Sequence, residues 1–466
     1  MQNNTLYRLI LLTIIPILMQ SCFSAKDYVR PSLENEALYR TDYVMTDSLS
    51  MATVSWTELF TDPILTDYIH QGLENNLDIR VALQNIQAAQ AYLKQGKSGY
   101  YPTLDASASY GRSTFSENGP MGLNGGSASE QYQLAASLSW EADIWGKIRS
   151  MDRAAQASYL QTVAAHQAVK THLIAAIGST YFRLLALDRQ KDLLKETIAS
   201  RKSSLTTTQA LKDAGQVTEV AVKQTEAQLY TTEILLIDLE KDIKLLENTF
   251  SILLGEAGQT VVRSTLEDQQ INTALTTGVP ADLLVNRPDV MAAEYSLINA
   301  FELTNVARSQ FFPSLRLTAS GGFQSLELDN LFSASSLFSN LAGSLAQPLL
   351  NGRRIRTQYE VSQAQQEQAL LNFKKTLLIA GKEVSDALYT YEAESQKIEA
   401  RKKELASYTL AETYSEELLN NGFANYLEVL TARQNALNSE LRLIDSQFGR
   451  LNAIVTLYEA LGGGWR

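Results

Sequence analysis

Cys22 is the only cysteine in 466 residues and the side chain with the clearest covalent chemistry. It follows Arg8 and an apolar run over 9–19, with the small residue Ser21 directly before it. This order is typical of a bacterial lipoprotein signal, in which residues 1–21 are removed and the cysteine is acylated. The apolar run is about 11 residues, against about 20 for a membrane-spanning helix, which disfavours a transmembrane anchor. An incidental thiol is also disfavoured, because a lone cysteine in an exported chain has no disulfide partner.

The histidines do not suggest a metal or catalytic site. There are three, His70, His166 and His172. His166 and His172 are six positions apart, whereas a metal pair on one helix face needs a spacing of about three or four. The sequence has no phosphate-binding loop, nucleophile elbow or zinc motif. We therefore predict no enzyme, and no cofactor apart from a covalent lipid on Cys22.

The charge of the chain excludes nucleic acid as a partner. There are 40 basic and 51 acidic side chains. Removal of residues 1–21 takes away Arg8, which leaves 39 basic residues (40 − 1) and a net charge of −12 (39 − 51). Phosphate binding requires clustered lysine and arginine. With 45% hydrophobic residues and 9 prolines, the composition is that of a folded protein.

Three short motifs occur twice in the same order. The shifts between copies are 211 (313 − 102), 206 (352 − 146) and 207 (422 − 215). A repeat of about 200 residues is far longer than the roughly 20 to 50 residues of solenoid units. We expect one interleaved structure of two matching halves, 67–277 and 278–466, after a tether at 22–66. The motifs are YPTL at 101–104 and FPSL at 312–315, WGKIR at 145–149 and NGRRIR at 351–356, and AGQ at 214–216 and NGF at 421–423.

Each half changes its hydrophobic period at the same place. Apolar residues recur every three or four positions over 67–96, which is typical of a helix. Period two then indicates strands, so each half is predicted to contribute one β-hairpin. The alternating stretches are 104–110, 132–140, 315–323 and 337–345.

Two proline-free stretches predict very long helices. Residues 147–211 and 353–421 each contain one internal glycine and mix polar and apolar residues throughout. As a single helix the first would be about 97 Å long. Such lengths indicate a coiled coil, a helical repeat or a membrane span, and the charges in both stretches exclude a membrane span.

A heptad pattern follows each long stretch. Sustained sevenfold spacing makes packed helices supercoil, so each half is predicted to form a helical hairpin. The hairpin turns contain Gly215 and Gly422, where the backbone needs glycine, and Thr218 and Asn425 lie where a helix cap is expected. The heptad seams run from Val222 to Phe250, Thr225 to Leu253, Leu427 to Val455 and Leu430 to Tyr458.

Four strands are too few to close a membrane barrel. Their segments lie within about 102–145 and 313–348. Outer-membrane barrels have about 8 or more strands, and an open sheet edge cannot face lipid because its backbone groups have no partners there. Two chains would supply 8 strands (2 × 4) and three chains 12 (3 × 4). An ordinary sheet of a soluble protein is the alternative, and the export signal, the paired hairpins and the helix lengths weigh against it.

Several longer motifs, in order along the chain, resemble one family. They are WEADIWGK at 140–147, VPADLLVNRPDV at 279–290, FFPSL at 311–315, NGFANYLEVL at 421–430 and YEALGGGW at 458–465. With these segments the chain resembles the TolC superfamily, specifically the outer-membrane efflux lipoproteins of the NodT, OprM and CusC type. The resemblance covers essentially the whole mature chain.

The resemblance implies a mainly α-helical homotrimer, in which three protomers share a 12-stranded β-barrel in the outer membrane and a long α-helical barrel in the periplasm. The chain would then be the passive exit channel of a tripartite efflux pump for small molecules. The turns with Gly215, Thr218, Gly422 and Asn425 would form the periplasmic tip, where a membrane-fusion adaptor docks. The implied further partners are outer-membrane lipid and an inner-membrane transporter of the RND type, or of the ABC or MFS type.

The resemblance also implies a constriction near the start of the last long helix. Related channels have an acidic residue there, and the matching position in this chain is Thr431. Leu427 matches a leucine that lines the same constriction, and Glu428 supplies charge only if its side chain faces inward. As a heptad residue, Leu427 is equally well explained by core packing, so both interpretations stay open.

Two other functions are compatible with the sequence. A type I protein-secretion channel has the same fold and differs in its partner and cargo. A periplasmic coiled-coil scaffold, a protein of another class, would have the heptads without paired β-hairpins.

Two further residue groups have ordinary structural explanations. Proline and aspartate in the segment 287–289 suit the first turn of a helix. The aromatic residues near the strands fit either a belt at the membrane surface or plain core packing. They are Tyr100, Tyr101, Trp140 and Trp145.

Overall fold

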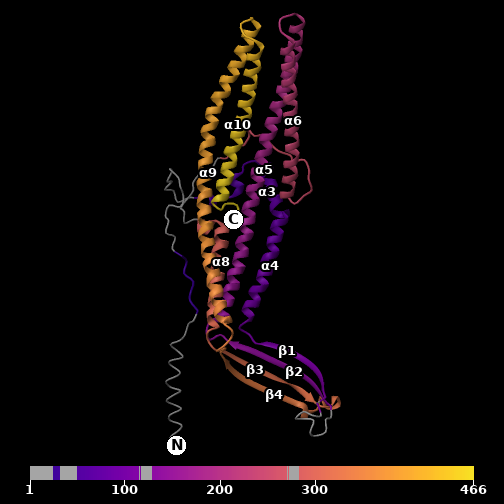
Figure 1. Ribbon diagram of the computed structural model, residues 1–466, viewed down its shortest axis with the longest axis vertical. Helices are drawn as coiled ribbons and strands as arrows, with labels where there is room; N and C mark the ends of the chain where they lie inside the picture. The colour runs from indigo at the N-terminus through magenta and orange to yellow at the C-terminus, as the bar shows by residue number, and fades with distance from the viewer. Residues whose placement is uncertain are drawn as a thin grey trace. The chain divides into compact units, whose positions relative to one another are not determined.

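The computed structural model describes residues 25–31, 50–114, 116, 128–269, 271 and 283–465. Helices predominate, and four β-strands accompany them (Figure 1). The chain divides into two compact units, and each draws on both halves of the sequence. The strand unit comprises 1–32, 87–161 and 293–373, and the hairpin unit comprises 33–86, 162–292 and 374–466. Cys22 and the predicted signal 1–21 lie outside the described residues.

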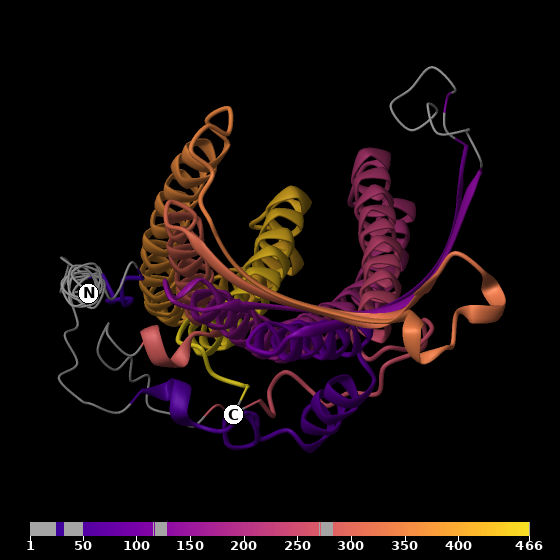
Figure 2. The same ribbon diagram turned by 90° about the horizontal axis from the view of Figure 1, so that it is seen from below.

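The strand unit contains one antiparallel sheet, in the order β1-β2-β3-β4. Figure 2 shows it as a curved layer. Both predicted β-hairpins are confirmed, and pairing of β2 with β3 joins them. Two short 3₁₀-helices, η4 (Leu328–Asn330) and η5 (Ala334–Ser336), connect β3 to β4. The strands are β1 (Thr103–Ser113), β2 (Ser129–Ala142), β3 (Ser314–Ser325) and β4 (Leu337–Ala346).

The register gives the sheet one apolar and one polar face. Successive side chains of a strand point to opposite faces, so each row of paired residues lies on one face. Polar rows alternate with apolar rows, as the period-two pattern predicts. One polar row is Asp105, Ser137, Ser320 and Asn340. Two apolar rows are Leu104, Leu138, Ala319 and Leu341, and Ala108, Leu134, Phe323 and Leu337.

Both long helices are continuous. α5 (Lys147–Asp213) and α9 (Arg354–Asn420) have 67 residues each, which corresponds to about 100 Å. Each reverses into a 35-residue helix, α6 (Glu219–Leu253) or α10 (Tyr426–Ala460), which lies beside it (Figure 1). Within the described residues, none of the helices is both long enough and apolar enough to cross a bilayer. The predicted heptad of α6 is buried at Val222, Thr225, Leu229, Thr232, Leu239, Ile243 and Phe250.

The helix predicted over 67–96 is interrupted, which corrects the sequence analysis. It consists of α3 (Pro63–Asn75) and α4 (Leu77–Ser98). Buried Asn76 separates them, and its Oδ1 accepts hydrogen bonds from the backbone N–H groups of Asp78 and Ile79 at 2.9 and 3.2 Å. Its Nδ2 donates to the carbonyl oxygen of Leu253 at the end of α6, at 2.9 Å. The hydrophobic spacing continues across Asn76, so periodicity did not reveal this corner.

A corner of the same design lies between α7 (Leu283–Asn286) and α8 (Pro288–Ser309). Arg287 is buried, and its Nη1 donates to the carbonyl oxygen of Ala460 at 2.9 Å, at the end of α10. The guanidinium also forms ion pairs with Asp289 and Glu383, both at 2.7 Å. Pro288 begins α8, as predicted. The sequence analysis did not identify Arg287 as the residue that binds the end of α10.

The folded part of the chain extends into the predicted tether. Residues 50–66 contain η1 (Met51–Thr53), α2 (Trp56–Leu59) and the first turn of α3. Met51 and Leu59 are fully buried, and the hydroxyl of Tyr458 donates to the carbonyl oxygen of Val54 at 2.8 Å. A tether does not need such contacts, so the predicted segment 22–66 is not a tether over its whole length.

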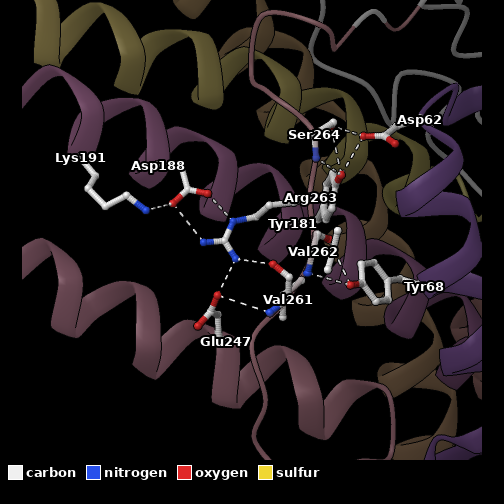
Figure 3. Close-up of polar contacts among 10 residues, drawn as sticks. All are labelled: Asp62, Tyr68, Tyr181, Asp188, Lys191, Glu247, Val261, Val262, Arg263 and Ser264. Atoms are coloured by element: carbon white, nitrogen blue, oxygen red, sulfur yellow. Dashed lines mark hydrogen bonds and ion pairs between the residues drawn. The ribbon is translucent and has the colours of Figure 1, made fainter.

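Within the hairpin unit, a polar network connects the segment 261–264, which follows α6, to α3, α5 and α6 (Figure 3). Arg263 forms ion pairs with Asp188 of α5 and, at 2.6 Å, with Glu247 of α6. Tyr68 of α3 bonds both the N–H and the carbonyl of Val262, at 3.1 Å each. Burial alone would raise the pKa of the Asp188 carboxyl, but hydrogen bonds from Arg263 and Lys191 hold it below its ordinary value.

Asp62 holds the other end of this segment. Its carboxylate accepts hydrogen bonds from the hydroxyls of Tyr181 and Ser264, and from the backbone N–H of Ile64 at the start of α3. Burial acts to raise the pKa of Asp62, but these bonds and one from Gln269 together lower it. Burial also raises the pKa of Tyr181 to about 12, so its hydroxyl stays protonated and able to donate.

We expect Arg263→Gln to destabilise the protein by about 3 kcal/mol, because it leaves the carboxylates of Asp188 and Glu247 without their cation. Thermal unfolding in detergent measures this as a lower midpoint. Arg442→Gln is the matched control, since Arg442 is exposed and forms no ion pair within the described residues. Equal midpoints for the two variants would show that the network does not contribute to stability.

Candidate functional site at the hairpin tips

The two turns that end the helical hairpins are built alike. Gly215 and Gly422 both have φ of +78°, a left-handed conformation that glycine adopts without a steric penalty. The next residue in each turn donates its N–H to the carbonyl five residues back, at 2.9 Å for Gln216 and 2.8 Å for Phe423. These bonds satisfy carbonyls that the helix end leaves free. The predicted role of both glycines in the turn geometry is confirmed.

The predicted caps differ between the two turns. Asn425 caps α10, because its Oδ1 accepts a hydrogen bond from the N–H of Glu428 at 3.1 Å. Its Nδ2 donates to the carboxylate of Glu428 at 3.0 Å. Thr218 occupies the N-cap position of α6 without a side-chain cap bond, so the capping prediction is wrong for this residue. In its place, Lys212 and Glu219 form an ion pair of 2.7 Å across the turn.

The three candidate gate residues are all exposed on α10. Leu427 is 57% exposed, so the core interpretation of this leucine fails within the single chain. Val429 and Ala432 are buried in its place. Thr431 donates its hydroxyl to the carbonyl oxygen of Leu427 at 2.8 Å. The carboxylate of Glu428 accepts a hydrogen bond from Asn425, and this capping interaction explains the side chain without a role in a gate.

A polar layer behind the tips connects the two helical hairpins. Arg433 of α10 binds Glu416 of α9 and donates to the hydroxyl of Ser204 of α5. Glu412 lies 3.5 Å from the same guanidinium. Burial raises the pKa of Glu412, although Arg433 opposes this shift. Neither the heptad pattern nor the motifs singled out Arg433.

Arg201 is the most buried cation of this layer. It is 7% exposed and forms no ion pair within the described residues. Its donors instead reach oxygens of Gln228 and Thr232 on α6, and Oε1 of Gln434 on α10 at 2.9 Å. Burial, together with repulsion from Arg433, lowers its pKa. A buried arginine at a heptad interface contradicts the usual apolar pattern, and periodicity did not reveal it.

Hydroxyl groups line the space next to this layer. A cavity of about 340 Å³ lies between α5, α9 and α10. Exchange of one protein hydrogen bond for bonds to water changes stability by only about 1 kcal/mol, so a polar layer opens more readily than an apolar core. The site is therefore suited to a change in spacing between hairpins. Its hydroxyl lining consists of Ser200, Ser203, Ser204, Thr207, Thr208 and Tyr426.

The described residues contain no cluster of three or more histidine, cysteine, aspartate or glutamate side chains that could hold a metal ion. His172 is paired with Glu459 at 3.0 Å. This hydrogen bond raises the pKa of the imidazole, against a smaller opposing effect of burial. His172 and Glu459 lie near the opposite end of α10 from the turn at 422–425, and the tips themselves present glycine turns, hydrogen bonds and an ion pair.

Comparisons with known proteins agree with this architecture. The model of the outer membrane efflux protein family matches residues 68–256 and 279–463. The solvent efflux pump outer membrane protein SrpC of Pseudomonas putida is 30% identical, with 96% of this chain and 97% of that protein aligned. The probable outer membrane lipoprotein SilC of Salmonella typhimurium is 28% identical over 99% of this chain and all of that protein.

A solved structure extends the similarity to three dimensions. A crystal structure of CusC, a cation efflux system protein of Escherichia coli, superposes with a TM-score of 0.83 at 26% identity. The match covers 94% of this chain and 99% of that chain. Because the match extends over nearly the whole chain, the protein has the TolC-like channel fold. The chain belongs to the outer membrane efflux protein family.

Proposed function

We propose that three copies of this chain form the outer-membrane exit channel of a tripartite efflux pump. The observation that carries the proposal is the four-stranded sheet, which has two open edges and one exposed apolar face. Backbone groups at an open edge have no partners in lipid. Three copies supply 12 strands (3 × 4), a number within the range of outer-membrane barrels.

The direction of the strands supports closure between copies. All neighbours in the sheet are antiparallel, and β1 and β4 lie at its edges. Because β1 and β4 run in opposite directions, β4 of one copy pairs antiparallel with β1 of the next. Every residue of β1 is exposed in the single chain, as expected for a strand that lacks one neighbour.

The height of the apolar face supports insertion in the membrane. Tyr101 lies two residues before β1 and Tyr110 three residues before its end, and both are exposed. The 11 residues of β1 span about 33 Å along the strand and about 25 Å along the axis at a strand tilt of about 40°. This value fits the apolar band of about 25 Å in outer-membrane barrels.

The long helices supply the periplasmic part of the channel. α6 and α9 each have an exposed apolar stripe in addition to their buried seams. Apolar stripes on helices drive association with further helices, here those of neighbouring copies. The stripe on α6 comprises Tyr230, Ile234, Ile237, Leu245 and Ile252, and that on α9 includes Leu371, Leu378 and Tyr389.

The turns at 215–218 and 422–425 are the proposed docking points for a membrane-fusion adaptor. An inner-membrane transporter of the RND type, or of the ABC or MFS type, then delivers the substrate and supplies the energy. SrpC is named for solvents and CusC for cations, so we propose small molecules as the substrate class. Neither name favours protein cargo, and a scaffold does not account for the four-stranded sheet.

Native mass measurement of the protein, extracted in detergent from outer membranes, tests the assembly. We expect three times the mass of the chain, because only closed edges are stable in lipid. We also expect ion conductance after reconstitution in a planar bilayer. A monomer in the soluble periplasmic fraction would contradict the proposal, since four strands would then have nothing to close them.

The gate proposal places Leu427 and Thr431 at the narrow end of the lumen. We expect Leu427→Ala to increase single-channel conductance, because a smaller apolar side chain widens a constriction. Leu410→Ala is the control, since Leu410 is a similarly exposed leucine of α9. Equal conductance for Leu427→Ala and the unmodified channel would show that Leu427 does not line the gate.

We propose that acylated Cys22 anchors the chain, a proposal that the similarity to a probable lipoprotein supports. The N-terminal peptide of the mature protein should begin at Cys22 and exceed its unmodified mass by the attached lipid. Cys22→Ser should lack this added mass, because the hydroxyl does not replace the thiol in acylation. An unmodified N-terminal peptide in the natural protein would disprove the anchor.

A further inference from the structure

The segment that leads from β4 into α9 exposes two adjacent leucines. Leu349 is 89% exposed and Leu350 is 99% exposed. Full exposure of neighbouring leucines is unfavourable in water, because their apolar surface is not removed from the solvent. Their surroundings in the assembled protein are therefore expected to be apolar.

Basic residues follow these leucines directly. Arg353 directly precedes α9, and Arg354 and Arg356 lie in its first turn. The stretch 330–359 contains no acidic residue, in a chain with a net charge of −11. Glu360 is the nearest acid and pairs with Arg353 and Arg356, at 3.0 and 3.2 Å. Arg354 forms no ion pair within the described residues. The segment 348–356, which we call the exit loop, is thus both apolar and cationic.

The exit loop continues the apolar face of the sheet. Leu341 and Leu345 of β4 are exposed on that face and lead directly to the loop. The same end of the sheet carries exposed aromatic residues, Tyr101 before β1 and Phe311 before β3. Aromatic side chains favour the depth of lipid headgroups. The residues at this end of the sheet are therefore of the types that lie at the surface of a membrane.

A small cavity lies beside the exit loop. Its volume is about 180 Å³, and Arg354, Pro348 and Trp145 are among its lining residues. Trp145 stacks on Phe312, with ring centroids 4.8 Å apart, and donates to the carbonyl oxygen of Pro313 at 2.7 Å. The carboxylate of Glu141 also lines the cavity, and Lys147 and Arg316 offset its charge at 2.8 and 3.4 Å.

We propose that the exit loop binds an anionic phospholipid in the periplasmic leaflet of the outer membrane. Leu349 and Leu350 insert among the acyl chains, and Arg353, Arg354 and Arg356 contact the phosphate. Guanidinium groups suit phosphate because their planar donors form paired hydrogen bonds with it. The inference rests on the proposed function, since the sheet must span the membrane for this end to meet the periplasmic leaflet.

Charge argues against a second copy of the chain as the occupant. With β4 paired to β1 of the next copy, the exit loop lies beside the residues that precede that β1. The stretch 79–104 contains basic residues, among them Lys94 and Lys97, and no acidic residue that could pair with the arginines of the loop. A ligand for the exit loop must instead combine an apolar portion with negative charge. An anionic phospholipid has both properties and is held at the required depth by the membrane.

Native mass spectrometry of the full-length acylated protein tests this inference. The detergent-solubilised protein is titrated with phosphatidylglycerol and, separately, with phosphatidylcholine. We expect tighter binding of phosphatidylglycerol, and its preference should fall roughly tenfold or more in the variant Arg353→Gln/Arg354→Gln/Arg356→Gln. The control variant Lys244→Gln/Arg442→Gln/Arg450→Gln removes the same charge from α6 and α10 and should keep the preference.

A second variant, Leu349→Ser/Leu350→Ser, should weaken both lipids while the trimer persists. Unchanged phosphatidylglycerol preference in the arginine variant would overturn the proposal. Dissociation of the leucine variant into monomers would also overturn it, because the loop would then be a contact between copies. The spectrum reports subunit number and bound lipid separately, so a failure of the trimer proposal is distinguished from a failure of lipid binding.

Discussion

An open sheet edge cannot exist in lipid, and most features of this protein follow from that constraint. Each backbone N–H and carbonyl in the bilayer needs a partner, and β1 and β4 each lack one neighbour. Curvature of the four-stranded layer, alternation of apolar and polar rows, and antiparallel order through all four strands suit closure with identical copies. In the proposed trimer the channel is inseparable from the assembly, because the lumen exists only when the edges of the sheets meet.

The long helices, which we propose form the periplasmic part of the channel, are held by polar contacts where the chain changes direction. A helix of 67 residues gains little order from local propensity, and its position is set by packing and by polar anchors. Asn76 and Arg287 hold the carbonyl ends of α6 and α10, and Arg263 fastens the segment after α6 to α5. These anchors are buried hydrogen bonds and ion pairs, and displacement would leave their polar groups unpaired away from water.

The tips have a different balance of forces. The turns are defined by glycine geometry, but the layer behind them consists of hydroxyls and two arginines, Arg201 and Arg433. A layer of this kind holds the two hairpins together and still exchanges its bonds with water at modest cost. The corners therefore hold the helices in place, whereas the spacing of the two hairpins can change at the end where partners are proposed to dock.

The sequence alone determined the element types, because periods of two, seven and three-to-four are properties of the chain itself. It located both tip glycines, the hairpins and the family. Tertiary structure decided which polar residues are anchors: Asn76 within a continuous hydrophobic pattern, Arg287 beside a proline, and Arg201 within a heptad interface. In the structure Leu427 is exposed, whereas its heptad position was compatible with either the core or the lumen. Thr218 lacks the side-chain cap bond that the sequence predicted. The reason is physical. Hydrophobic periodicity reports which face of an element is buried, whereas these polar anchors depend on partners from other elements, up to 233 residues away for Arg201 and Gln434, which no local pattern encodes.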